Sequence, residues 1–524
     1  MSKFITEGMI SMSNDATRGT WTSRSTFILA AVGSAVGLGN AWRFPGLAAK
    51  HGGGAFLMVY LIAMVVIGIP LLAMEISIGR RMKRGAPGSL RGLNKKFEPI
   101  GWAATANAFI IEIYYSVVFA WVIMMAIFSF KFAGLTGDSE AASGVWTTLI
   151  KTTGTTSGYA TISVPVLLCL IGAWAMIWLC IRNSAHSVGK VVKYTVFLPV
   201  ICLVLMAAKG LTMEGAAEGM KALFIPDFSA LSNASLWIDA IGQVFYSMSI
   251  MMAIMYAYGS FLQEDSNVAA DTVIIAFSDL AISVLSGIVL FSTMYGTGMT
   301  TNDMSTSGIG TAFMIYPSAI VNLTGNGTAN AVFAFIFYFC LCTLAIDSAF
   351  SIVEGVATAI ADKFNIAKRK STLYVCIVSA VISLFFVTGA GLAWLDIVDN
   401  WCNSFNLILV GVLEAIAVGW FFKTDSVLKE INRNTNKFRM PAWWFNTAIR
   451  YIAPLLLAGF FTWNFVALIK SGGIYGAESG YSLASNIIGG WLITVLVFAS
   501  GYIINAIVKK NKKLIKTAED VWTD

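Results

Sequence analysis

Residues 33–45 read GSAVGLGNAWRFP, a glycine-rich apolar stretch that contains an amide, Asn40, and an arginine, Arg43. The sequence around it is apolar enough for a membrane-spanning helix, in which backbone groups must be hydrogen-bonded inside the protein. Ionisable side chains in such a helix are rare and mark functional sites. We therefore expect a discontinuous helix whose freed amides and carbonyls bind a small molecule or an ion, as in transporters.

The composition is that of a polytopic membrane protein. Of the 524 residues, 57% are hydrophobic and only 12% are charged, which is too apolar for a soluble domain. Runs of about 20 apolar residues are long enough to cross a bilayer. They predict twelve spans at residues 26–47, 55–79, 101–132, 161–182, 191–209, 236–261, 272–296, 330–361, 372–391, 397–422, 446–469 and 485–508.

The charged loops predict the orientation. Lysine and arginine gather after the second span, after the eighth span and in the C-terminal tail, whereas Asp138 and Glu140 lie between spans three and four. Because basic loops stay cytoplasmic, we expect a multi-pass protein of the cell (inner) membrane with both termini in the cytoplasm. The net charge of +7 then reflects topology, and no soluble domain is left to bind nucleic acid. The polar start of the chain predicts no cleaved signal peptide.

The sequence lacks the residue patterns that are typical of enzyme active sites. The seven cysteines have no metal-site spacing, and His51 and His186 are the only histidines. No serine, cysteine or metal motif of a membrane protease accompanies them. We therefore expect no enzymatic activity.

A second polar interruption lies five spans after the first, at Gln243, Ser247 and Ser249. Because five is odd, a repeat that starts at span six enters the membrane from the opposite side, and the site then lies between spans one and six. The segments expected are a cytoplasmic N-terminal segment 1–25, a first repeat 26–210, a second repeat 211–425, two peripheral spans in 426–508 and a basic tail 509–524.

Two long outer segments, 134–160 and 297–329, are rich in Gly, Thr, Ser and Asn. Segments of this length are often functional lids. The second contains apolar patches, so we expect it to pack into the outer mouth of the protein.

Several motifs in order resemble the neurotransmitter:sodium symporter family over nearly the whole chain. Besides 33–45, they are HGGGAFLMVY at 51–60, GIPLLAMEISIGR at 68–80, IYY at 113–115, GQVFYSMS at 242–249, SDLAISVLSGIVLF at 278–291 and AIDSAFSIVEGVATAIADKF at 345–364. The resemblance implies an all-α fold of twelve transmembrane helices, with a five-plus-five inverted repeat and broken helices one and six.

The resemblance also implies two sodium sites. For the first ion it assigns the carbonyl of Ala35 and the side chains of Asn40, Ser247 and Asp279, completed by the substrate carboxylate. For the second ion it assigns the carbonyls of Gly33, Val36 and Leu344 and the side chains of Asp347 and Ser348. Oxygen ligands of this kind suit a hard cation.

Asp279 stands where many relatives have Asn. In chloride-dependent members an anion is held by side chains at the positions of Tyr60, Gln243, Ser247 and Ser283. An ionised Asp279 one helical turn from Ser283 would supply that negative charge itself and repel an anion. We therefore do not expect chloride to be required. Asp347 replaces a Thr of many bacterial members, and a carboxylate should bind the second sodium more strongly.

Gly37 bears on the substrate. Monoamine carriers have an Asp at this position, and its absence leaves room for a substrate carboxylate near the amides of Leu38 and Gly39 and the Tyr115 hydroxyl. An amino acid, most of all a neutral or hydrophobic one, is therefore favoured. The resemblance completes the pocket with Ala35, Ile111, Tyr246, Ser247, Ser249, Met252, Ser348 and Ile352. Met251 and Met252 replace a common Gly and Phe and could reshape the pocket.

The resemblance implies two gates. Arg43 would pair with Asp399 above a lid made of Tyr115 and Tyr246, and Arg18 would pair with Asp362 at the inner face. Span five carries Gly189 and Pro199, a spacing that resembles a device for unwinding the cytoplasmic half of that helix.

These features predict sodium-coupled import by alternating access, with substrate and ion sharing ligands. Three alternatives remain: a same-fold symporter for another small zwitterion of the GABA, taurine or betaine type, a proton-coupled permease, and a channel or non-transporting sensor. The second needs a basic side chain at the second sodium site, where Asp347 and Ser348 stand. The oligomeric state is left open.

Overall fold

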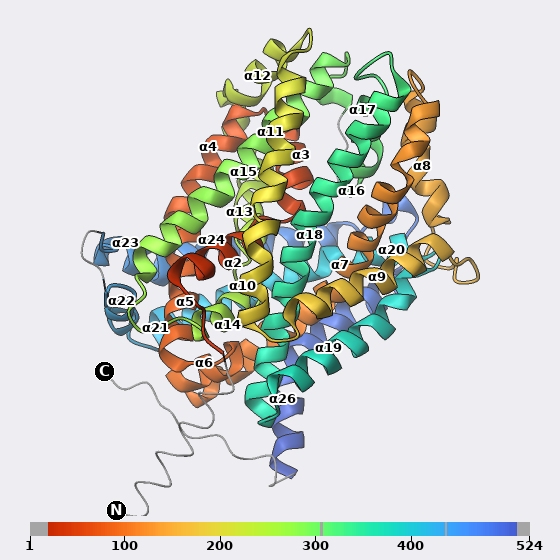
Figure 1. Cartoon of the computed structure of the whole chain (residues 1–524). Coiled ribbons are helices and arrows are strands. Elements are labelled where there is room, and N and C mark those ends of the chain that lie inside the picture. The colour runs from red at the N-terminus through yellow and green to blue at the C-terminus, as the bar shows by residue number, and fades with distance from the viewer. Residues whose placement is uncertain (1–18, 304–307, 435–437, 511–524) are drawn as a thin grey trace, which may run out of the picture.

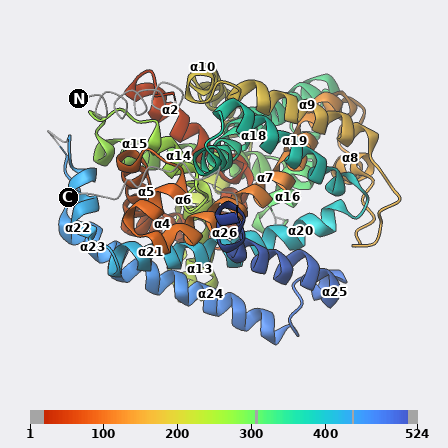
Figure 2. The same cartoon turned by 90° about the horizontal axis from the view of Figure 1, so that it is seen from below.

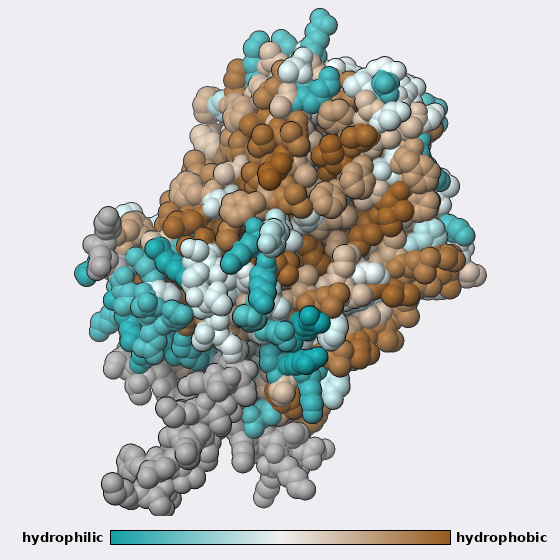
Figure 3. Space-filling model, in the orientation of Figure 1, coloured by the Kyte–Doolittle hydropathy of each residue, from teal (hydrophilic) through white to brown (hydrophobic). Residues whose placement is uncertain are grey.

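The computed structural model describes residues 19–303, 308–434 and 438–510. The regular secondary structure of this part of the chain is helical, apart from two isolated β-bridges. Figure 1 shows long helices running between a top end, with α12 (Ala216–Phe224) and α17 (Tyr316–Ile320), and a lower end, with α6 (Ala86–Leu93). A broad hydrophobic surface lies between more polar ends (Figure 3). Leu168 and Ile171 are 64% and 60% exposed, as expected of side chains that face lipid.

Ten of the twelve predicted spans correspond, in the described residues, to helices that are long and apolar enough to cross a membrane. They are Gly54–Met82, Lys95–Gly134, Val164–Ile181, Ala185–Leu211, Val268–Gly296, Gly327–Phe364, Lys368–Val387, Gly391–Trp420, Ala442–Lys470 and Leu483–Lys509. Predicted spans three, five and ten begin six residues earlier than expected, at 95, 185 and 391 instead of 101, 191 and 397. The apolar run marks only the part of a helix inside lipid, and the helix itself continues into the polar region.

The last two spans are the least buried of these ten helices. Only 28% and 22% of their apolar windows are buried, against 83% for the third span. Seen from below, α24 (Ala453–Lys470) runs along the edge of the molecule, whereas α18 (Gly327–Phe364) lies further in (Figure 2).

The first span is broken, as predicted. Helix α2 (Arg24–Ala35) is followed by the π-helical turn η1 (Gly39–Arg43) and by α3 (Phe44–Lys50), and the two halves are bent by 52°. The amide of Gly37 would reach the Gly33 carbonyl in a continuous helix. It donates instead to Oδ1 of Asn40 at 3.0 Å, so the break exposes main-chain groups at mid-span.

The sixth span is also broken. It consists of α13 (Ala234–Ser247), a non-helical stretch, and α14 (Ile254–Ser260). With 14 and 7 residues, neither half spans a hydrocarbon core of roughly 30 Å at about 1.5 Å per residue.

The stretch between α13 and α14 has an unusual backbone. Ser249, Met251 and Ala253 have φ of 54°, 66° and 62°, a left-handed conformation that costs a non-glycine residue about 1–2 kcal/mol. Two hydrogen bonds hold it: the Met251 amide donates to Oε1 of Glu75 at 2.7 Å, and Ser249 Oγ donates to the Ser34 carbonyl at 2.9 Å. Contacts with spans two and one therefore stabilise this strained backbone.

The outer segment 297–329 packs against the outer mouth, as predicted for its described part. Its turn η7 (Thr311–Ile315) places the buried ring of Phe313 at 5.0 Å from Trp146 and 5.9 Å from Trp42, measured between ring centroids. Because Trp42 belongs to η1, this segment touches the broken first span directly.

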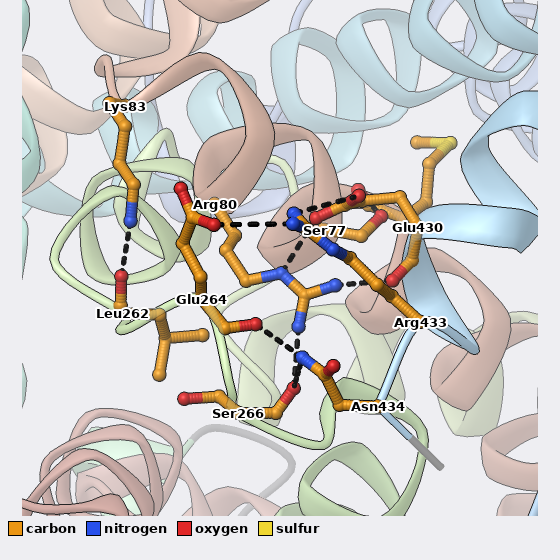
Figure 4. A network of polar contacts seen from close by, with 10 residues as sticks. Ser77, Arg80, Lys83, Leu262, Glu264, Ser266, Glu430, Arg433 and Asn434 are labelled. Atoms are coloured by element: carbon orange, nitrogen blue, oxygen red, sulfur yellow. Dashed lines mark hydrogen bonds and ion pairs between the residues drawn. The ribbon is translucent and has the colours of Figure 1, made fainter. Parts of the chain in front are cut away.

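Arg80 joins three segments of the chain (Figure 4). From the end of α5 (Ile69–Met82), its Nε donates to Oε1 of Glu430 at 2.8 Å, and its Nη1 donates to the Ser266 carbonyl at 2.6 Å. Glu430 lies on α22 (Thr424–Ile431), between spans ten and eleven. Both side chains are buried, so loss of either partner would leave a buried charge without its nearest counter-charge.

Candidate functional site

A cavity of about 30 Å³ lies between the broken helices. All twelve residues predicted to contact substrate line it, together with Ser34 and Asn40. The lining residues are Ser34, Ala35, Gly37, Leu38, Gly39, Asn40, Ile111, Tyr115, Tyr246, Ser247, Ser249, Met252, Ser348 and Ile352. The structure thus brings the predicted set together. Ser34 was missed, although it directly precedes a predicted ligand, and its hydroxyl donates to Ser351 Oγ at 2.8 Å.

Glycine is required at two positions of the broken first span. A Cβ on Gly37 would lie 2.5 Å from Ser348 Oγ and 3.6 Å from the Tyr115 hydroxyl, and one on Gly39 would lie 2.6 Å from the ring of Tyr246. The Tyr115 hydroxyl is buried and makes no well-formed hydrogen bond in the described residues. A buried hydroxyl of this kind is available to a ligand.

Asp279 is the centre of a buried hydrogen-bond cluster on α15 (Val268–Gly296). Its carboxylate accepts from Asn40 Nδ2 at 2.6 Å and from the Tyr60 hydroxyl at 2.9 Å, and Ser247 Oγ lies 2.7 Å from both oxygens. Asn40 Nδ2 also lies 2.8 Å from Ser283 Oγ. These donors compensate for the burial of the carboxylate.

Of the four chloride-type positions, Tyr60, Ser247 and Ser283 belong to this cluster, but Gln243 does not contact Asp279. Gln243 Nε2 donates to the Gly39 carbonyl at 3.2 Å, and its Oε1 accepts from Arg43 Nη1 at 3.0 Å. Gln243 therefore links α13 to the broken first span.

Asp347 faces the first span from α18. Its Oδ2 lies 2.7 Å from the position that a Cβ on Gly33 would take, and its Oδ1 is buried with no hydrogen-bond partner in the described residues. Ser348 Oγ donates to the Ser34 carbonyl at 3.3 Å. Buried Leu344 lies one turn earlier on α18, and buried Val36 lies in the break. An unpartnered buried carboxylate oxygen beside main-chain carbonyls suits a cation.

Span five approaches the same place. Val196 Cγ2 lies 3.0 Å from the position that a Cβ on Gly33 would take, and Val196 separates α10 (Ala185–Thr195) from α11 (Phe197–Leu211). Pro199 has no N–H for the carbonyl four residues earlier, which explains an interruption here. Gly189, about two turns before the interruption, packs against α2, where its Cβ would lie 2.6 Å from Thr26 Cγ2.

The predicted outer pair Arg43–Asp399 is not formed in this structure. Arg43 donates to Gln243 and lies over the Tyr246 ring, 5.4 Å from its centroid, while Asp399 accepts from Asn403 Nδ2 at 2.8 Å. The guanidinium is therefore held by α13, and Asn403 satisfies the carboxylate. The contact of Gln243 with Arg43 was not predicted, because the resemblance assigns Gln243 only to a chloride-type position.

Trp21 closes the end of the site that lies toward α6, which the sequence predicts to be the inner side. Its Nε1 donates to the Tyr258 carbonyl at 2.9 Å, and its amide donates to the Phe261 carbonyl at 3.0 Å. Asp362 accepts from the Gly85 amide at 2.8 Å. Arg18, its predicted partner, lies outside the described residues.

Comparison with known proteins identifies this architecture. The sequence model described as "Sodium:neurotransmitter symporter family" matches residues 18–136 and 145–510. The chain belongs to the sodium:neurotransmitter symporter family. It is therefore a sodium-dependent, multi-pass membrane symporter and not an enzyme, and the predicted family is confirmed.

Two similar transporters match this symporter over most of their length. An uncharacterised sodium-dependent transporter of Methanocaldococcus jannaschii is 32% identical over 95% of this chain and 98% of its own length. The sodium-dependent neutral amino acid transporter B(0)AT3 of Rattus norvegicus is 28% identical over 87% of this chain and 86% of its own.

A solved structure of MhsT in complex with L-phenylalanine superposes on this chain with a TM-score of 0.73. It is 26% identical and covers 85% of this chain and 99% of its own. The predicted all-α fold with broken first and sixth helices is thereby confirmed.

Proposed function

We propose that this symporter imports neutral, predominantly hydrophobic amino acids together with two sodium ions and without chloride. The observation that carries the proposal is the cavity lined by Gly37, Ser348 and Tyr115, in which the buried Tyr115 hydroxyl makes no well-formed hydrogen bond in the described residues. A carboxylate placed there would meet the amides of the broken helix, which favour an anion. The apolar part of the cavity, with Ile111, Met252 and Ile352, would receive the side chain.

Two comparisons support this substrate class. The rat relative is named a neutral amino acid transporter, and the similar solved structure contains L-phenylalanine. A cavity of about 30 Å³ holds only a few water molecules, so a side chain as large as phenylalanine requires movement of its walls. Met252 is suited to such movement because its side chain is flexible.

The first sodium would bind between Asn40, Ser247 and Asp279, next to the Ala35 carbonyl. Asn40 Nδ2 now lies 2.6 Å from Asp279, so an ion that enters there turns the amide oxygen toward itself. The substrate carboxylate completes the ligand set. Ion and substrate then raise one another's affinity, which is the coupling that a symporter needs.

The second sodium would bind between Asp347, Ser348 and the carbonyls of Gly33, Val36 and Leu344. Its route to the inside would open when span five unwinds around the interruption at Val196. Release of this ion would loosen the contact of α2 with α18 and free Trp21 from α14. The basic loops support an orientation in which this inner side, and both termini, lie in the cytoplasm.

Asp279 would make chloride unnecessary. Its carboxylate takes the hydrogen bonds of Tyr60 and Ser247 that an anion would otherwise receive. A second negative charge in this buried cluster would be repelled.

The test uses purified protein in two steps. A thermal-shift screen in sodium, over the twenty amino acids plus GABA, taurine and betaine, identifies the substrate, because a ligand stabilises the folded state that binds it. Uptake of that substrate into proteoliposomes is then measured with sodium replaced by choline. We expect stabilisation by hydrophobic amino acids and loss of uptake in choline. Undiminished uptake in choline contradicts sodium coupling, and stabilisation by GABA, taurine or betaine alone contradicts the substrate class.

A further inference from the structure

Glu112 is a buried carboxyl group that the proposed transport cycle does not use. It lies on α7 (Glu98–Ile127) between two residues of the cavity, Ile111 and Tyr115, and it is 1% exposed. Neither carboxyl oxygen has a hydrogen-bond partner in the described residues. A glutamate in this situation at mid-membrane calls for a physical explanation.

The facing side of span nine is polar as well. Helix α19 (Lys368–Ser383) carries Thr372, Cys376 and Ser379, which are spaced four and three residues apart and so share one face. All three are buried, and the hydroxyls of Thr372 and Ser379 have no hydrogen-bond partner in the described residues. Cys376 lies within electrostatic range of Glu112. The buried face of span nine that carries Cys376 is therefore polar and contains two unpartnered hydroxyls.

The surroundings contain no positive charge for an ionised Glu112 among the residues that the structure describes. The titratable groups that interact with it electrostatically are Tyr115 on its own helix and Cys376 on α19. Cys376 also interacts with Glu354 on α18, which accepts from Ser184 Oγ at 2.6 Å and lies 3.3 Å from Lys368 Nζ. Lys368 is therefore engaged by another carboxylate. An ionised carboxylate without a partner is far more costly here than a neutral acid.

The protonation state of Glu112 affects the electrostatics of the substrate cavity. Tyr115 is three residues further along α7, and the two groups interact electrostatically. An ionised Glu112 would oppose a substrate carboxylate at the Tyr115 hydroxyl, whereas a neutral one would not. By linkage, a carboxylate bound at Tyr115 raises the proton affinity of Glu112 as much as the proton raises substrate affinity.

We propose that Glu112 is a proton-binding site behind the substrate cavity, and that its protonation is coupled to binding of the substrate carboxylate. This inference rests on the proposed amino-acid function. The proton comes from water, and no bond other than the carboxyl O–H forms.

The test compares Glu112→Gln with Glu140→Gln, the same change at an exposed residue of α8 (Ser139–Ile150). Binding of L-phenylalanine, or of the amino acid that stabilises most in the screen, is measured in constant sodium from acidic to alkaline pH. In the wild type and in Glu140→Gln, affinity should fall at alkaline pH by up to about tenfold per pH unit, the limit for one linked proton. Glu112→Gln should keep the acid-pH affinity throughout. A pH-independent wild type, or a Glu112→Gln variant that follows the wild type, overturns the proposal.

Proton uptake gives a second readout on the wild type. Addition of substrate to weakly buffered protein at alkaline pH should raise the pH reported by a dye, and Glu112→Gln should abolish that change. If Glu112→Gln does not fold, Glu112→Leu removes the same proton site with an apolar side chain and serves in its place. Failure of this inference is distinguishable from failure of the proposed function, because in the latter case the wild type shows no sodium-dependent amino-acid binding at any pH.

Discussion

Gly37 is the residue at which the shape of the cavity is most easily changed. We expect Gly37→Ala to lower amino-acid affinity by about tenfold or more, because its Cβ would lie 2.5 Å from Ser348 Oγ and displace that hydroxyl into the substrate space. Gly172→Ala on α9 (Val164–Ile181) is the matched control, since nothing lies within 4 Å of its Cβ position. Equilibrium binding of the substrate in sodium measures both. Equal affinity of Gly37→Ala and the wild type would show that the substrate does not use this space.

Substitution of Asp279 tests the proposal that transport is independent of chloride. The wild type should transport equally in chloride and in gluconate. Asp279→Asn removes the negative charge but keeps the shape, so Tyr60 and Ser247 become available to an anion, and uptake should then depend on chloride. Asp425→Asn, an exposed position on α22, serves as the control. Uptake by Asp279→Asn that ignores chloride would count against this role.

At the scale of elements, the first break could be predicted because it depends on residues with distinct physical properties. Glycines and an amide in an apolar run conflict with a continuous helix, and the structure places the break where they lie. The backbone conformation of the sixth span was harder to predict. Ser249, Met251 and Ala253 take a left-handed backbone that their own preferences oppose, and Glu75, distant in sequence, holds it. Tertiary contacts of this kind leave no local signal.

The side-chain partners show the same limit. The cavity set came from motifs matched position by position, and all of it lines one cavity. The pairing of Arg43 depends on which of several nearby acceptors the conformation presents. In this structure that acceptor is Gln243 and not Asp399.

The interruption of span five predicts that a substitution there lowers the rate of transport while substrate binding persists. Pro199→Ala restores an N–H to the helix and should make unwinding less favourable, by roughly 1 kcal/mol for the added hydrogen bond. We expect sodium-dependent substrate binding to persist while the rate of uptake falls about fivefold, the factor that this free energy corresponds to. Pro165→Ala is the matched control, because Pro165 lies in the first turn of α9, where a proline N–H is not needed. A Pro199→Ala variant with undiminished uptake would argue against unwinding as the route of sodium release.

For the whole molecule, the orientation in the membrane decides which gate faces which compartment. The basic loops predict that the end carrying α8 and α12 is extracellular and that the end carrying α6 is cytoplasmic (Figure 1). Thr155→Cys lies in the exposed loop after α8, and Arg369→Cys lies at the exposed start of α19. A membrane-impermeant maleimide applied to intact cells should label Thr155→Cys at once and Arg369→Cys only after permeabilisation. The wild type is the blank, because its seven cysteines are free and buried or half-buried.

The opposite labelling pattern would invert the transport cycle as well as the topology. Trp21, bound to α14, closes the end of the molecule that carries α6, and span five reaches Asp347 from that same end. If that end faces the cytoplasm, the second sodium leaves into a compartment where sodium is scarce, and its departure drives import. If it faces outward, the same contacts describe an outer gate, and a sodium gradient directed into the cell would favour retention of the ion at Asp347. The labelling experiment therefore tests the direction of transport as directly as it tests the positions of the termini.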